Sequence, residues 1–400
     1  MTIEVRPVEG EEELREFARV HATAFGHRWE DEKLEKVILP WLPKVHAIGA
    51  FDGATMVGVS VDQPYEMTLP GGAMAPTRGI TWVGVLPTHR GRGALRAMIE
   101  HQHAGFREQG LAFSALYASE TTIYGRFGYG PATVLASEAE IDTRFGRFGV
   151  PFEDTGWVVM LEDPEPLAIV REVIDRSRPG IPGEIDRTDE DITDVFKVAD
   201  RKEFRIAHRD AEGRWDGYAA YTIDGKWEHD AIPQSRLQVS SLLSATPEAH
   251  AALWRYLLDM RLVRTVVVGS RPLDDPIRWL LAEWRHYRVR HVADGLWIAL
   301  LDVPAALEAR GYLTDGEVVL EVGGTRHLLR VEGGAGRCLP TDREPEIELS
   351  APVLASVYLG GYRFTQLRDG MRLAERRPGA CVRADSLFRA EREPWCSYEF

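Results

Sequence analysis

The sequence predicts a mixed α/β protein built from more than one domain. Its 400 residues exceed the roughly 100–200 residues of a typical domain, so two or three domains are expected. Strand-like and helix-like patterns alternate in the first region of the chain and recur in two later regions. An apolar fraction of 44% can fill several cores, and no run of about 18 apolar residues predicts a membrane span.

The first region opens with a helix pattern followed by strand patterns. Apolar and charged residues alternate at helical spacing over Glu11–Phe25, which predicts an amphipathic helix. Val45–Ser60 predicts two paired strands around an Asp52-Gly53 turn. Gly79–Leu86 is apolar and β-branched, as in a central strand, and Pro87 ends it because proline cannot donate to a strand ladder.

The clearest helix follows this strand. A mostly apolar stripe recurs at helical spacing, and Gly110 stands where a C-terminal cap belongs. The stripe consists of Leu95, Met98, Ile99, Gln102 and Phe106. Strand patterns return at Ala112–Ala118 and Ala132–Ile141. This strand–helix–strand order predicts a mixed sheet with a crossover connection.

A second region, roughly 149–290, repeats that order with weaker patterns. Arg236–Ser244 is a strand candidate, and Thr246-Pro247-Glu248 opens a helix that runs to Met260. Threonine can cap this helix, and proline fits its first turn. Thr265–Gly269 is a further strand. The region resembles the first but lacks an arginine- and glycine-rich loop before the helix.

A third region begins near Gly295 and contains both helix and strand patterns. A helix start is predicted at Val303, and a helix over Ala351–Leu359 follows Ser350. The predicted strands are Gly316–Val322, His327–Val331 and Glu346–Leu349.

The net charge and the cysteine content argue against several classes of function. A net charge of −14 argues against nucleic acid as the main partner. It suits a cationic ligand if the acidity gathers in a cleft, although acidity that only keeps the chain soluble is the simpler interpretation. The spacing of Cys338, Cys381 and Cys396 predicts neither a disulfide framework nor a metal site. The first residues lack an apolar signal segment, so we expect a cytoplasmic protein.

The strongest local pattern is a strand that leads through an arginine- and glycine-rich turn into the clear helix. The stretch from Val83 to Ala94 reads V-G-V-L-P-T-H-R-G-R-G-A. Glycines allow close approach of a phosphate, and the free N–H groups and dipole of the helix start favour a pyrophosphate. Arg90, Arg92 and Arg96 add positive charge. The alternative is a tight turn with solvated arginines.

This stretch resembles the coenzyme A loop of the GCN5-related N-acetyltransferases, Arg-x-x-Gly-x-Gly/Ala, with Leu95 in place of the last small residue. The chain is more similar to one subgroup, the Eis (enhanced intracellular survival) acetyltransferases, from about residue 80 to its end. The matching stretches are Pro87 to Arg90, Ala118 to Glu120, Ile123 to Ala132, Asp294 to Trp297, Val303 to Tyr312, Tyr358 to Gly360, and Glu399-Phe400.

The resemblance implies an architecture and an activity. Two GNAT-like acetyltransferase domains in tandem, 1–147 and a degenerate one at 148–292, would precede a sterol-carrier-protein-like domain at 293–400. Acetyl-CoA would bind only the first, and the chain would assemble as a homohexamer. The implied cofactor contacts are Val83, Gly84, Val85, Gly91, Arg92, Gly93, Ala94, Leu95, Arg96, Ser119 and Glu120.

The resemblance also implies Tyr124 as general acid and the α-carboxylate of Phe400 as general base. Chemistry gives a separate reason for both. The leaving thiolate needs a proton donor, and a phenol with a pKa of about 10 is a plausible one. A terminal carboxylate, with a pKa near 3.5, is a weak base in water, but in a dry site it can accept a proton through water or orient the amine. The alternatives are a core tyrosine and a frayed chain end.

The acceptor implied by the resemblance is a primary amine of an aminoglycoside, a polyamine or a lysine side chain. Phe25 and Trp82 would line its pocket, and Glu399 would add negative charge. His27 stands where an acidic residue is expected, which leaves acceptor specificity open. The competing interpretation is a non-catalytic protein that binds coenzyme A or a lipid.

Overall fold

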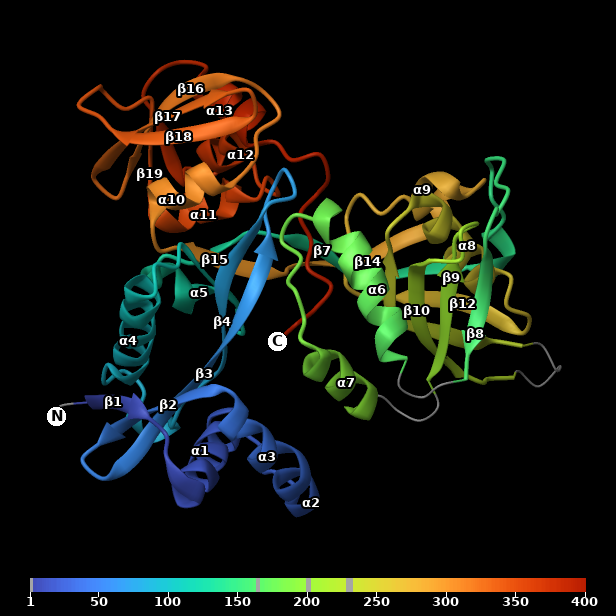
Figure 1. The fold of residues 1–400 in the computed structure, drawn as a ribbon, viewed down its shortest axis with the longest axis horizontal. Coiled ribbons are helices and arrows are strands. Elements are labelled where there is room, and N and C mark those ends of the chain that lie inside the picture. Colours follow the sequence, from blue (N-terminus) through green and yellow to red (C-terminus); the bar gives the residue numbers. More distant parts are fainter. Residues whose placement is uncertain (1–2, 163–165, 199–202, 228–232) are drawn as a thin grey trace.

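The computed structural model describes residues 3–162, 166–198, 203–227 and 233–400. Strands within these ranges form three sheets, each the centre of its own unit, and the C-terminus of the chain lies between the units (Figure 1). In the described part of the chain, no helix is long and apolar enough to cross a membrane.

The first sheet has helices on both faces. Along β2, Ile48 and Ala50 pack with Met98 of α4, whereas Ala47 packs with Phe17 of α1, because successive strand residues point to opposite faces. The strands, in sheet order, are β1 (Ile3–Pro7), β2 (His46–Asp52), β3 (Thr55–Thr68), β4 (Met74–Val85), β5 (Phe113–Tyr117), β15 (Leu296–Leu300) and β6 (Gly130–Pro131). The helices are α1 (Gly10–Ala24), α2 (Asp31–Lys33), α3 (Leu39–Trp41), α4 (Ala94–Glu108) and α5 (Thr121–Tyr124).

The second sheet is also covered on both faces. Trp254 and Leu257 of α8 fill the core on one face, and Val173 of α6 packs with Tyr218 on the other. The strand order is β13 (Arg271–Pro272), β7 (Val134–Asp142), β12 (Val263–Val268), β11 (Ser235–Ser244), β10 (Trp215–Asp224), β9 (Phe204–Arg209) and β8 (Trp157–Leu161), and β14 (Tyr287–Asp294) also pairs with β7. The helices are α6 (Leu167–Ser177), α7 (Asp189–Val198), α8 (Pro247–Leu258) and α9 (Ile277–Leu280).

The third unit packs its helices on a smaller sheet. Arg310 is buried in its core, where the guanidinium donates to the main-chain oxygens of Tyr358 and Phe388. The strand order is β18 (Ala335–Pro340), β17 (Thr325–Glu332), β16 (Gly316–Val322), β19 (Ile347–Leu349) and β20 (Leu373–Glu375). The helices are α10 (Val303–Ala309), α11 (Ala351–Tyr358), α12 (Phe364–Asp369) and α13 (Ala380–Phe388).

The local elements predicted from the sequence are present. The helix predicted after Thr246 is α8, and the threonine hydroxyl accepts from the N–H of Ala249 as a cap should. Gly110 follows α4 with a left-handed φ of 73°, as predicted for the end of that helix. The central strand β4 is longer than predicted, because it begins at Met74 and pairs with β3 along most of its length.

Two strands join sheets on the far side of the proposed boundaries at 147/148 and 292/293. β7 precedes residue 147 but lies in the second sheet, where it pairs with β12. β15 follows residue 293 but lies in the first sheet, between β5 and β6. An apolar pattern predicts a strand but not the strands with which it pairs. The sequence therefore did not predict that β7 lies in the second sheet and β15 in the first.

Candidate active site

A cleft opens where two parallel strands of the first sheet diverge. β4 pairs with β5 only from Thr77 to Ile80, and β4 then continues alone on that side to Val85. A cavity of about 920 Å³ lies at this opening, between the end of β4, the start of α4 and the segment that follows β5. The volume falls within the roughly 300–1,000 Å³ of ligand pockets.

A β-bulge shapes the wall formed by β4. The β3–β4 register passes from Val61 opposite Thr81 to Val59 opposite Gly84, so β4 carries one extra residue there. Trp82 within the bulge has a left-handed φ of 55°, which is strained for a tryptophan. Val83, Gly84 and Val85 line the cavity. Trp82 instead packs among aromatic side chains near α1.

The start of α4 forms the second wall. Gly91 and Gly93 have φ values of 74° and 92°, and a Cβ on either would meet no atom within 4 Å. No side chain caps α4, because its N-cap is Gly93. The N–H groups of the first turn are therefore free of a side-chain cap, and the positive end of the helix dipole adds to their field. Arg96 lines the cavity beside them.

The structure brings most of the predicted cofactor residues to this one cleft. Those that line it are Val83, Gly84, Val85, Gly91, Gly93, Ala94, Leu95, Arg96, Ser119 and Glu120. Arg92 lies in the same exposed turn but does not line the cavity. Ile123, Arg126 and Phe127 also line the cavity, on a third wall, although they were not predicted to do so. All three fall within the stretch that resembles the Eis proteins.

Tyr124 lies on this third wall at the end of α5. It lines the cavity, although only 5% of its surface is exposed. Burial, with a smaller contribution from Glu120, raises the pKa of Tyr124 to about 12. The phenol therefore carries its proton throughout the neutral pH range and can act as a donor toward the cleft.

The chain ends against the opposite side of β4. The terminal main-chain oxygen of Phe400 accepts a hydrogen bond from Thr81 Oγ1 at 3.1 Å. Its ring packs on Tyr65 and Tyr117, with centroids 4.9 and 5.4 Å apart. A Cβ on Gly79 would lie 2.6 Å from this ring, so only glycine leaves room for it. The chain end is thus held rather than frayed, and Glu399 beside it is exposed.

Trp82 belongs to an aromatic cluster that the sequence analysis only partly anticipated. Its ring stacks on His21 at 4.2 Å, and Trp29 and Trp41 lie 5.6 and 4.8 Å from it. Phe25, predicted beside the acceptor, is half exposed and lies 4.7 Å from His21. His21 is a buried residue of α1. The apolar spacing that predicts this helix does not predict which rings His21 contacts.

The chemistry of the cluster is that of a neutral aromatic surface. Burial, followed by the nearby charge of His27, lowers the pKa of His21 to about 4. The imidazole is therefore uncharged at neutral pH and stacks as a flat ring. Electron-rich aromatic faces attract cations, an interaction worth about 0.5–2 kcal/mol per contact.

The residues of the cleft fit acetyl-CoA. The open side of β4 offers backbone groups to an extended pantetheine arm, and the uncapped helix start offers N–H groups to the pyrophosphate. The two glycines with open space at their Cβ positions allow phosphate oxygens to approach the backbone. These features form one continuous cavity with Tyr124 on its wall.

Comparison with known proteins agrees with this geometry. Residues 4–132 and 183–298 match two models of the acetyltransferase (GNAT) domain, and residues 303–397 match the sterol carrier protein domain. The chain is 36% identical over 366 residues to N-acetyltransferase Eis of Mycobacterium tuberculosis (strain ATCC 25177 / H37Ra), covering 88% of each chain. It is 35% identical to an uncharacterized N-acetyltransferase of Streptomyces griseus, covering 87% of this chain and 88% of that one.

Solved structures give the same result. Eis1 from Mycobacterium abscessus superposes with a TM-score of 0.86 at 29% identity, over 99% of this chain and all of the other. A GCN5-related N-acetyltransferase from Kribbella flavida superposes with a TM-score of 0.77 at 23% identity, over 100% of this chain and 98% of that one, and supports the fold. The predicted fold class and family are confirmed: the chain belongs to the Eis family of acetyl-CoA-dependent GNAT N-acetyltransferases.

Proposed function

We propose that the protein transfers the acetyl group of acetyl-CoA to a primary amine of a cationic acceptor, an aminoglycoside, a polyamine or a lysine side chain. Tyr124 is the general acid, and the α-carboxylate of Phe400 is the general base. The observation that carries this proposal is the anchored chain end, which bonds Thr81 beside the bulge that forms the cleft wall. Chain ends are ordinarily frayed, so one that is held against the strand forming the cleft wall supports a role in the reaction.

The cofactor is held by the walls of the cleft. Backbone groups of Val83 and Val85 would hold the pantetheine arm, and the start of α4 with Arg96 would hold the pyrophosphate. Ser119 and Glu120 flank the opposite side. When bound, acetyl-CoA supplies a thioester carbonyl that an amine can attack.

Tyr124 supplies the proton that the departing sulfur needs. A pKa of about 12 keeps the phenol protonated at neutral pH. Its proton moves to sulfur as the C–S bond breaks, because only then does the sulfur carry enough negative charge to take a proton from so weak an acid. The wall position of Tyr124, beside the end of β5, supports this role.

The Phe400 carboxylate acts on the amine. A primary amine with a pKa near 10 is mostly an ammonium at neutral pH and must lose a proton before it attacks. A carboxylate held near β4 attracts the ammonium electrostatically and accepts that proton, directly or through water. The exposed carboxylate of Glu399 adds a second negative charge for an acceptor with several amines.

The aromatic cluster completes the acceptor site. Phe25 and Trp82 present ring faces to a cationic acceptor, and the neutral ring of His21 supports Trp82 by stacking. The acidic balance of the whole chain, −14, favours the approach of a polycation.

The test is to extend the chain by three residues, Gly-Ser-Gly, beyond Phe400 and to measure thiol release from acetyl-CoA with a panel of amines. The extension moves the carboxylate away from Thr81 without touching the cofactor walls. We expect kcat to fall by at least about 100-fold, with the Kd for acetyl-CoA unchanged. A chain with the same three residues added before Met1 is the matched control. Equal turnover in both extended proteins would exclude the carboxylate as the base.

We also propose that the protein is a homohexamer. The outer strand β8 and its neighbour β9 expose the large apolar side chains of Trp157, Met160 and Phe204, as expected for a surface covered by another chain. Light scattering should give about six times the mass of one chain. A monomer at micromolar concentration would contradict this proposal.

A further inference from the structure

The second acetyltransferase fold contains a reduced counterpart of the cofactor cleft. β11 pairs in parallel with β12 from Ser235 to Val239 and then continues without a partner on that side to Ser244, just as β4 extends beyond its pairing with β5 in the first fold. A cavity of about 170 Å³ lies at this opening, between the end of β11 and the start of α8. It is smaller than the roughly 300–1,000 Å³ of ligand pockets, because residues of this chain fill the space.

Part of the filling is a buried ion pair. Arg271 Nη1 donates to the main-chain oxygen of Leu242 at 2.5 Å, so the unpaired edge of β11 is satisfied by this side chain. Asp275 accepts from Arg271 Nε at 2.6 Å and lies 2.9 Å from His250 Nε2. The Arg271 guanidinium thus occupies, on β11, the position that corresponds to the cofactor site on β4 of the first fold.

The C-terminal segment provides the rest. Trp395 is 5% exposed, lines the small cavity and packs with Leu243 and Val173 in the core of the second fold. The guanidinium of Arg271 lies 4.9 Å from the centroid of the Trp395 ring, a cation–π contact in a buried setting. So deeply buried a tryptophan is not expected in a free chain end, and here it is a core residue of a different domain.

From Trp395 the segment crosses to the first fold in extended form. Every second N–H group of the segment donates a hydrogen bond to the second fold. Glu393 N donates to Asp274 Oδ2 at 3.2 Å, and Trp395 N donates to Pro182 O at 2.8 Å. Ser397 N donates to Glu184 Oε2 at 3.0 Å. Two main-chain oxygens then accept from the first sheet, Tyr398 O from Tyr117 at 2.7 Å and Phe400 O from Thr81 at 3.1 Å. The segment therefore bridges both folds.

We propose that the cofactor-like cleft of the second fold is the anchor site for the chain's own C-terminal segment, and that Trp395 is the positioning residue that sets where the Phe400 carboxylate lies. An extended chain rises about 3.3 Å per residue, so a slip of one residue at the anchor moves the carboxylate beyond hydrogen-bond reach of Thr81. The catalytic consequence rests on the proposed role of Phe400, whereas the anchoring itself does not.

The experiment replaces Trp395 with alanine and measures two properties of the full-length protein. The first is the rate at which a carboxypeptidase releases Phe400, which requires the terminal carboxylate to leave Thr81. The second is kcat with acetyl-CoA and an amine. We expect release to accelerate at least tenfold and kcat to fall at least tenfold, because small misplacements of reacting groups cost up to about 100-fold, while the Kd for acetyl-CoA stays unchanged.

Two further variants separate positioning from simple destabilisation. Trp395→Phe keeps a ring over Arg271 and should restore most of the protection and the rate. Leu257→Ala opens a cavity in the core on the α8 face of the second fold, away from the segment, and should lower the Tm without changing Phe400 release or kcat. If Trp395→Ala does not fold, Trp395→Phe and Trp395→Leu are compared in its place.

The outcomes are distinct. If the carboxypeptidase releases Phe400 from Trp395→Ala as slowly as from the wild type, Trp395 does not anchor the C-terminal segment. Equally fast release from Leu257→Ala would also overturn it, since any loosening of the second fold would then free the chain end. Fast release from Trp395→Ala with unchanged kcat would support the anchor and refute the general-base role of Phe400.

Discussion

The two acetyltransferase folds share a backbone plan but treat the start of their central helix in opposite ways. In the first fold, the N-cap of α4 is Gly93, which has no side chain to cap the helix. In the second fold, the N-cap of α8 is Thr246, whose hydroxyl accepts from Ala249 N at 3.1 Å. The helix start is thus available to a ligand in one fold and satisfied internally in the other.

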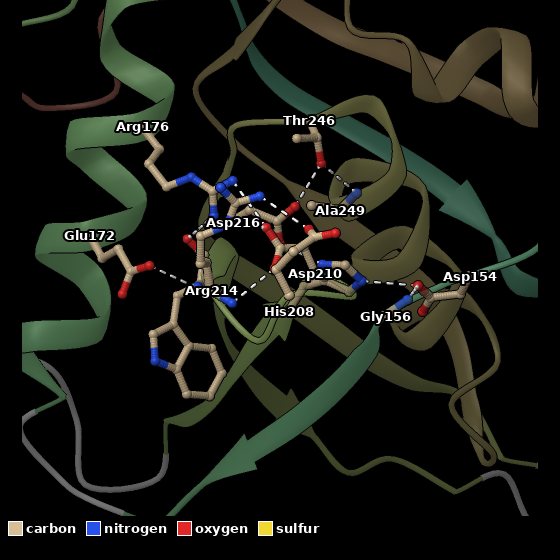
Figure 2. Close-up of polar contacts among 12 residues, drawn as sticks. Asp154, Gly156, Glu172, Arg176, His208, Asp210, Arg214, Asp216, Thr246 and Ala249 are labelled. Carbon is tan, nitrogen blue, oxygen red and sulfur yellow. Dashed lines mark hydrogen bonds and ion pairs between the residues drawn. The ribbon is translucent and has the colours of Figure 1, made fainter.

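The cap of α8 is part of a buried polar network (Figure 2). Thr246 Oγ1 donates to Asp216 at 2.8 Å, and the other oxygen of Asp216 lies 2.6 Å from His208 Nδ1. On the far side of the ring, His208 Nε2 lies 3.0 Å from Asp154. The strand–helix–strand frame alone therefore does not make a cofactor site. The site depends on which groups satisfy the helix start and fill the space beside it.

The largest effect should come from Tyr124→Phe in the first fold. Removing the proton donor should lower kcat by about 100-fold or more, with little change in the Kd for acetyl-CoA, because only the leaving sulfur needs the hydroxyl. Because the pKa of Tyr124 is about 12, the wild type should show no loss of rate from this group between pH 7 and about pH 10. The matched control is Tyr287→Phe, which removes a buried hydroxyl from the second fold. An equal fall in kcat in that variant would contradict the role of Tyr124 as the proton donor.

The second effect concerns stability in the second fold. His208→Asn leaves two carboxylates without their shared partner and should reduce the free energy of unfolding by about 3 kcal/mol. Burial disfavours the charged ring, but the hydrogen bonds and charges of Asp216 and Asp154 outweigh it and raise the pKa of His208.

This direction sets the pH dependence. A histidine with a raised pKa in the folded state contributes stability below its unfolded pKa of about 6.5, and the contribution is lost as pH rises through the folded pKa. Urea unfolding from pH 6 to pH 9 should therefore show the gap between wild type and His208→Asn narrowing at high pH. A gap that widens with pH would contradict the assignment of a charged ring.

The third effect is on cofactor affinity. Arg96→Ala should weaken acetyl-CoA binding by about five- to tenfold, because an exposed guanidinium beside a pyrophosphate contributes on the order of one charge-assisted contact. The loss should shrink at 0.5 M salt, since exposed charges are screened. Arg255→Ala, an exposed arginine on α8, is the control and should leave the Kd unchanged by calorimetry.

The smallest effect tests the cap itself. Thr246→Ala should cost about 1 kcal/mol of unfolding free energy, the usual loss for a helix N-cap, and should not alter the Kd for acetyl-CoA. Thermal unfolding measures the first quantity and titration the second. A change in acetyl-CoA affinity would mean that the second helix start also contributes to cofactor binding.

The local elements and the position of the cleft could be predicted from short stretches of the chain. Local patterns predicted the strand before Pro87, the glycine-rich turn and the helix α4. These patterns depend only on residues a few positions apart in the chain. Tyr124 and most of the residues predicted to bind the cofactor line one cavity, because they flank one strand–helix–strand unit. Thr246 was likewise identified as a cap from its immediate context.

Contacts between distant segments could not be predicted in this way, because they depend on how the whole chain packs. β7 and β15 exchange between sheets, because a strand can pair with any compatible edge and the choice depends on the packing of the whole chain. The stacking of His21 on Trp82 and the burial of Trp395 in another domain are contacts between segments remote in sequence. No local pattern encodes them, since their free energy comes from surfaces that exist only once the separate folds have formed.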